Sequence, residues 1–205
     1  VDDLANRPHQ CELLLDQNLG RNTCDYDDLV PSDCQRLIGP RFALLRPEFK
    51  VLRDESLARR QVCGTNRILI SLGGVDIDNV TGRVVDSLDH SPIRETIELD
   101  IVMGATAPHL EEVRRRVLDL PFPATVSVNV KDMARRMNRA DFSIGAAGST
   151  SWERCCMGLP AIMVVLAENQ RLIAEALTSL KAGLAVEREE IETKIPRLTE
   201  EWIGN

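Results

Sequence analysis

From Arg67 onward, short apolar runs alternate with amphipathic segments along the chain. The apolar runs predict strands at 67–74 (closing in a glycine turn), 97–104, 124–130, 141–146 and 160–166. The amphipathic segments predict helices at 78–89, 108–120, 131–140 and 169–183, and a further helix that begins at residue 151. The charged tail at 187–205 is also expected to be helical. Five consecutive strand-helix units predict an α/β, Rossmann-like, doubly wound parallel sheet, in which ligands bind outside the carboxyl ends of the strands.

The first part of the chain has a different pattern. Residues 11–18 (CELLLDQN) predict a strand, whereas residues 19–49 are rich in turn residues and are not expected to form a sheet by themselves. A short connecting helix is expected at 52–61. We therefore predict that residues 1–55 are the last elements of an amino-terminal domain plus a linker, and that residues 56–205 form the Rossmann-like domain. Because the sequence opens with what resembles the end of a strand, we expect further residues upstream of Val1.

Composition narrows the class of protein. The chain has 205 residues, 43% hydrophobic but only 3% aromatic, so its core must be aliphatic, which suits a parallel sheet covered by helices. A net charge of −7 argues against a nucleic-acid surface and against an anionic membrane, and no apolar run approaches the length of a membrane span. The six cysteines show no metal-binding or C-x-x-C spacing, which favours free thiols in a reducing cytoplasm. No metal or cofactor is expected.

Two glycine-containing loops follow predicted strands. In SLGGVD (71–76), Gly73 and Gly74 would let the backbone approach a ligand, although a tight turn with Asp76 as helix cap explains the same residues. In GAAGSTSWE (145–153), small side chains around Gly148 would leave backbone amides and the hydroxyls of Ser149 and Thr150 facing an anion such as phosphate. The alternative is a capping box in which Thr150 is the N-cap and Glu153 bonds back to it; local chemistry favours neither.

Two further strand-to-helix junctions carry candidate ligand contacts. In LAENQ (166–170), Glu168, Asn169 and Gln170 offer neutral or acidic hydrogen-bonding groups, although Asn169 would also serve as the cap of the following helix. In VNVKDM (128–133), Val130 and Met133 could form an apolar wall for a planar base, whereas a methionine at helical spacing more often belongs to the core.

These motifs together carry a family resemblance that extends over essentially the whole chain. NRADFSIGAAGSTSWERCCMGLPAIMVVLAENQ, LISLGGVD, DDLANRPHQCELLLDQN and GPRFALLRPEF closely resemble the nucleotide-sugar hydrolases of pseudaminic acid biosynthesis. That family removes UDP from UDP-2,4-diacetamido-2,4,6-trideoxy-β-L-altropyranose. It is similar in turn to glycosyltransferases of the GT-B fold, such as the enzyme that makes lipid II.

The resemblance implies a UDP or UDP-sugar ligand and a role for each candidate residue. The turn from Val130 to Met133 would hold the uracil, and Glu153 would bind the ribose in preference to capping a helix. Asn169 would reach the diphosphate or the sugar, with Glu168 and Gln170 beside it. The residues implied to line the diphosphate are Gly73, Gly74, Gly148, Ser149 and Thr150.

The sequence departs from the family at one important motif. The catalytic histidine expected in a G-x-G-H loop does not occur here, so the catalytic residue is expected outside this chain. The resemblance then implies the UDP-binding, carboxy-terminal part of a hydrolase, in which a histidine activates water to expel UDP with inversion. A UDP-sugar glycosyltransferase of the same fold and a non-catalytic sugar-nucleotide-binding subunit are the alternatives.

Overall fold

The computed structural model describes residues 1–61, 66–92 and 96–203 and contains a six-stranded parallel sheet. Its order is β5-β4-β3-β6-β7-β8, so the doubly wound, Rossmann-like α/β fold is confirmed. The sixth strand, β8, was not predicted; it lies between the helices expected at 169–183 and 187–205. The strands are β3 (Arg67–Ser71), β4 (Glu98–Met103), β5 (Ala124–Val128), β6 (Phe142–Ala146), β7 (Ala161–Val165) and β8 (Gly183–Glu187).

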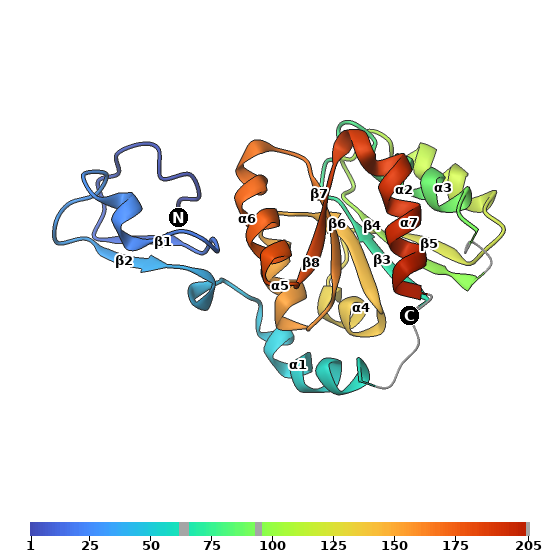
Figure 1. The fold of residues 1–205 in the computed structure, drawn as a ribbon, viewed down its shortest axis with the longest axis horizontal. Helices are drawn as coiled ribbons and strands as arrows, with labels where there is room; N and C mark the ends of the chain where they lie inside the picture. Colours follow the sequence, from blue (N-terminus) through green and yellow to red (C-terminus); the bar gives the residue numbers. More distant parts are fainter. Residues whose placement is uncertain (62–65, 93–95, 204–205) are drawn as a thin grey trace.

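Helices cover both faces of this sheet, as Figure 1 shows. One face carries α2 (Val80–Asp89), α3 (Leu110–Leu118) and α7 (Ile191–Ile203), whose apolar residues share a core cluster with β3 and β4. The other face carries α1 (Pro47–Arg59), α4 (Met133–Arg139), α5 (Thr150–Cys156) and α6 (Glu168–Ser179). Every residue of β6 and β7 is buried, which explains why neither strand alternates between apolar and exposed polar residues.

Residues before α1 form a small unit of their own, drawn in blue in Figure 1. Two short strands, β1 (Leu13–Asp16) and β2 (Gln35–Ile38), pair in parallel, and two 3-10 helices, η1 (Thr23–Tyr26) and η2 (Pro40–Phe42), lie in the connections. The predicted strand at 11–18 is confirmed as β1. The turn-rich stretch after it supplies the partner strand β2, which the glycine and proline content concealed. We call residues 1–46 the N-terminal unit.

Helix α1 joins this unit to the sheet domain, and Figure 1 shows it lying along the same face as α4. Phe49 is fully buried in a cluster with Leu69 and Met137, so the helix is packed onto the domain rather than free. The expected boundary between residues 55 and 56 falls inside α1; the division into domains stays a prediction. Among the described residues, no helix combines the length and the apolar character that crossing a membrane requires.

The docking of α1 can be tested with Phe49→Ala. Removing a fully buried phenylalanine leaves a cavity and should lower the free energy of unfolding by about 3–5 kcal/mol, measured by urea denaturation. The matched control is Val51→Ala on the same helix, where the side chain is 78% exposed and little change is expected. Equal, small effects of both substitutions would contradict the packing of α1 described above.

Candidate functional site

The order of the strands reverses at one point of the sheet. The chain runs outward from β3 to β5 and then returns to β6, which pairs with β3 on its other side, with Ser71 opposite Gly145. Connections on the two sides of this junction cover opposite faces, so the loops that leave the carboxyl ends of β3 and β6 separate there. These are the two glycine loops singled out from the sequence.

The glycines in these loops serve different purposes. A Cβ on Gly145 would overlap the guanidinium of Arg154 and lie 2.8 Å from the Ser71 carbonyl oxygen, so packing requires glycine there. Gly148 and Gly74 have open space where a Cβ would stand, and Gly73 adopts φ +104°, a left-handed conformation that favours glycine. Packing does not explain Gly148, and its bare backbone is accessible from solvent.

Helix α5 begins differently from the capping-box alternative. It starts at Thr150 with Ser149 as its N-cap, and Ser149 makes no side-chain capping bond. The capping box with Thr150 as N-cap is therefore wrong. The Glu153 carboxylate instead lies 3.6 Å from Arg46, which belongs to the N-terminal unit. Burial raises the pKa of Glu153, and the nearby Arg46 guanidinium opposes that shift.

Helix α6 begins at Glu168, with Ala167 at its N-cap. Asn169 does not cap it, so that interpretation is also wrong. Its side-chain Nδ2 donates to Asp3 Oδ2 across 3.3 Å, linking α6 to the N-terminal unit. Gln170 Oε1 accepts a hydrogen bond from the Leu166 amide at 3.1 Å and holds the loop before the helix.

A cavity of about 370 Å³ lies where these loops meet the N-terminal unit. Four predicted residues line it: Gly148, Ser149, Asn169 and Gln170. Its other wall comes from residues that the sequence analysis did not select, namely Val1, Asp2, Asp3, Arg7, Gln17 and Asn18, with Ala147 and Ile173 completing the lining. The sequence did contain a signal for this wall. Polar residues directly follow the apolar run of β1, and two aspartates stand in the opening VDD.

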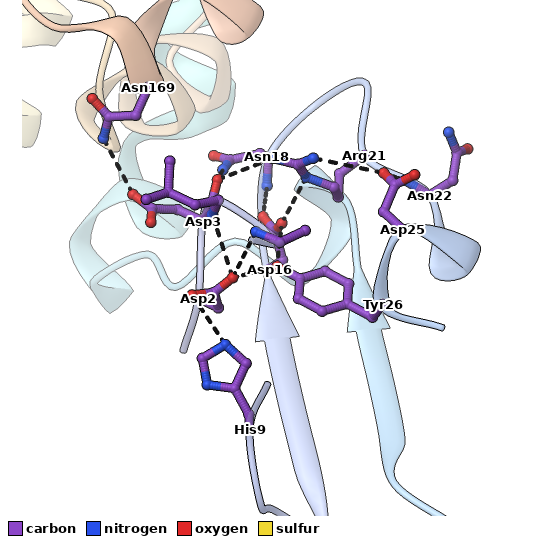
Figure 2. Close-up of polar contacts among 12 residues, drawn as sticks. Asp2, Asp3, His9, Asp16, Asn18, Arg21, Asn22, Asp25, Tyr26 and Asn169 are labelled. Carbon is purple, nitrogen blue, oxygen red and sulfur yellow. Dashed lines mark hydrogen bonds and ion pairs between the residues drawn. The ribbon is translucent and has the colours of Figure 1, made fainter. Parts of the chain in front are cut away.

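Hydrogen bonds within the N-terminal unit hold the second wall in place (Figure 2). The Tyr26 hydroxyl lies 2.9 Å from Asp2 Oδ2 and 2.8 Å from Asp16 Oδ2, so two buried carboxylates share one hydroxyl proton. Asp16 also accepts from the Asn18 amide at 2.9 Å. Burial raises the pKa of Asp2, but bonds from the Ala5 amide and from Tyr26 outweigh it and leave the pKa lowered.

The remaining predicted residues do not line this cavity. Glu168 is exposed beside an adjoining cavity of about 220 Å³. Met133 is 9% exposed and packs with Leu69 and Met137, as the core interpretation predicts, and Val130 is half-buried against the same cluster. Four further predicted residues line neither of these two cavities, namely Gly73, Gly74, Thr150 and Glu153.

A family model decides the classification of this architecture. The model described as "Glycosyltransferase family 28 C-terminal domain" matches residues 78–203. The chain belongs to this family. The match includes the loop after β6 and the first turn of α6, which form one side of the cavity.

Curated relatives and a solved structure agree with that assignment. Spore coat polysaccharide biosynthesis protein SpsG of Bacillus subtilis is 30% identical over 146 residues, covering 71% of this chain and 42% of SpsG. A UDP-2,4-diacetamido-2,4,6-trideoxy-beta-L-altropyranose hydrolase of Campylobacter jejuni is 25% identical over 181 residues, covering 88% of this chain and 61% of the hydrolase. The chain therefore spans less than two thirds of either relative. The crystal structure of Acinetobacter baumannii MurG superposes with a TM-score of 0.57 at 21% identity, covering 71% of this chain and 42% of MurG.

Tyr26 offers a direct test of the wall that Figure 2 shows, because it is the only tyrosine in the sequence. Burial, and then its bonds to Asp16 and Asp2, raise the pKa of its hydroxyl. The native protein should show no tyrosinate absorbance at about pH 11, whereas the unfolded chain should ionise near pH 10. Since the folded pKa is raised, this contribution to stability is complete below about pH 10 and declines above it. Tyrosinate appearing in native protein near pH 10 would contradict the shared hydrogen bond.

Proposed function

We propose that this chain forms the UDP-binding part of an enzyme that releases UDP from a UDP-sugar, with water as the acceptor. The observation that carries the proposal is the cavity beyond the carboxyl ends of β6 and β7, where the Gly148 loop and the first turn of α6 face a polar wall of the N-terminal unit. The name of the Campylobacter jejuni relative, which spans most of this chain, supports both the UDP-sugar substrate and hydrolysis.

The diphosphate is proposed to bind at the loop after β6. Gly148 and Ser149 both line the cavity, Gly148 has open space where a side chain would stand, and amides at a helix start favour negative charge. The same groups stabilise the charge that grows on UDP as the bond to the sugar breaks, which is how this part of the protein would contribute to catalysis. Gly73, Gly74 and Thr150 are proposed to complete the diphosphate site.

The nucleoside is proposed to lie on the side of α5 and α4. Glu153 is a half-buried carboxylate whose only described ion-pair partner, Arg46, stands at 3.6 Å, which is beyond hydrogen-bond distance. Its oxygens therefore have capacity to accept ribose hydroxyls. The turn from Val130 to Met133 is proposed to contact the uracil, with the Val130 side chain as its apolar surface.

The sugar is proposed to occupy the part of the cavity between α6 and the N-terminal unit. Asn169 and Gln170 supply amide groups there, and Asp3 supplies a carboxylate, so donors and acceptors both face the ligand. Such a wall suits hydroxyl and acetamido substituents, which need both kinds of partner. A base that activates water is not assigned to a residue of this chain.

Transfer to a second sugar or a lipid is the alternative function, and the glycosyltransferase family 28 match favours it. The two functions share the UDP site and differ on the acceptor side. UDP release from a UDP-sugar by the whole enzyme in water alone, measured by a coupled UDP assay, is the result expected of a hydrolase. Turnover that strictly requires an added sugar or lipid acceptor would overturn the hydrolase and support the transferase.

The ribose contact of Glu153 can be separated from its ion pair. Glu153→Ala should weaken uridine binding about 10- to 100-fold by calorimetry, because hydrogen bonds to a charged group contribute about 1.5–3 kcal/mol. Glu48→Ala is the matched control, since Glu48 also pairs with Arg46, at 3.1 Å. If both variants weaken binding equally, the effect comes through Arg46 and the ribose contact is wrong.

The contact of Asn169 with the sugar or the diphosphate predicts a loss of turnover. Asn169→Ala should lower kcat/KM for the UDP-sugar about 3- to 10-fold, the effect of one neutral hydrogen bond. Glu175→Ala, an exposed position on the same helix, should leave kcat/KM unchanged. Identical kcat/KM values for Asn169→Ala and the unmodified protein would remove Asn169 from the site.

A further inference from the structure

Arg154 is a buried cation without an ion pair among the described residues. Arg154 is 4% exposed and lies in α5, directly behind the glycine loop. Nη2 donates to the Ala146 carbonyl at 2.6 Å and to Ser151 Oγ at 2.9 Å, both neutral acceptors. Nε is buried and has no hydrogen-bond partner in the described part of the chain.

Such an arrangement is costly unless something compensates the charge. Moving a cation out of water is energetically unfavourable, and buried charges in proteins are normally paired or fully hydrogen-bonded. Burial lowers the pKa of Arg154 to about 10, with opposing contributions from Cys155 and Glu153 too weak to cancel it. The guanidinium nevertheless remains protonated at neutral pH, so the positive charge is present, and no described residue forms an ion pair with it.

The position of the guanidinium indicates where a counterion would bind. It contacts the carbonyl of Ala146, which is followed directly by the cavity-lining residues Ala147, Gly148 and Ser149. Gly145 also accommodates it, because any Cβ at that position would overlap Nη1. Glycine at position 145 of the buried strand β6 therefore leaves the space that the guanidinium occupies beneath the loop.

We propose that Arg154 is the positioning residue of the diphosphate site: it fixes the loop through the Ala146 carbonyl, and its charge is compensated by the bound anion. This inference rests on the proposed function, because it takes the ligand of the loop to be the diphosphate of a UDP-sugar. Arg154 acts from behind the loop, without contact to the ligand. It adds a buried positive charge on the loop side of the cavity, whose other wall carries Arg7.

The first test compares Arg154→Lys with Arg154→Gln in calorimetric titrations of UDP, uridine and inorganic pyrophosphate. Gln keeps a hydrogen-bond donor but loses the charge, whereas Lys keeps the charge. Arg154→Gln should weaken UDP and pyrophosphate binding about 10-fold or more, with uridine changed less than about 2-fold, and Lys should restore most of the loss. Parallel losses for uridine and UDP, or equal losses for Lys and Gln, would overturn the role of the charge.

A second pair of variants keeps Arg154 intact, in case its replacement prevents folding. Ser151→Asp places a carboxylate beside Nη2 as an internal counterion, and Ser151→Asn is its isosteric neutral control. The Asp variant should melt at a higher temperature than the Asn variant without ligand and bind pyrophosphate about 10-fold more weakly, because the site's counterion is already present. Equal melting temperatures and equal pyrophosphate affinities for the two variants would overturn the proposal.

The pyrophosphate titrations separate this inference from the proposed function. Arg154-dependent binding of pyrophosphate without any binding of UDP would support the inference and overturn the UDP-sugar substrate. UDP binding that Arg154→Gln leaves unchanged would support the UDP-sugar substrate and overturn the role of Arg154. Unmodified protein that binds neither compound would overturn both.

Discussion

The pairing of β3 with β6 is the contact on which the candidate site depends. It joins two strands that are separated by two further strand-helix units, and it reverses the order in which strands are added to the sheet. Because connections on either side of the reversal cover opposite faces, the loops at the carboxyl ends diverge and leave space for a ligand. Gly145 allows this pairing to coexist with Arg154, because a Cβ there would collide with both the guanidinium and the β3 backbone.

The site combines two parts of the chain that differ in how they hold their polar groups. On the sheet side, the loop after β6 leaves its backbone bare, and positive charge lies behind it in Arg154. On the opposite side, the N-terminal unit fixes acidic and amide side chains by hydrogen bonds that converge on Tyr26 and Asp16 (Figure 2). The ligand that we propose has the same division, with an anionic diphosphate at one end and a neutral, hydroxyl-rich sugar at the other.

Sequence reasoning found one side of this site and missed the other. Gly148, Ser149, Asn169 and Gln170 were predicted because loops after strands meet at one edge of a parallel sheet, which is a consequence of topology class alone. Asp3 could not be found in that way, because its contact with Asn169 joins residues 166 positions apart in the sequence. No local pattern encodes such a contact. Roles as ligand contacts remain proposals for all of these residues.

The sequence by itself determined the periodicity of strands and helices, the aliphatic core and the placement of small residues after β6. These properties depend on neighbours within a few positions, since side-chain direction repeats every two residues in a strand and every 3.6 in a helix. Only the tertiary structure decided which hydrogen-bond or ion-pair partner each polar side chain contacts. Glu153 faces Arg46 instead of capping α5, and Arg154 lies under the loop, because burial and long-range packing outweigh the small energies of local capping.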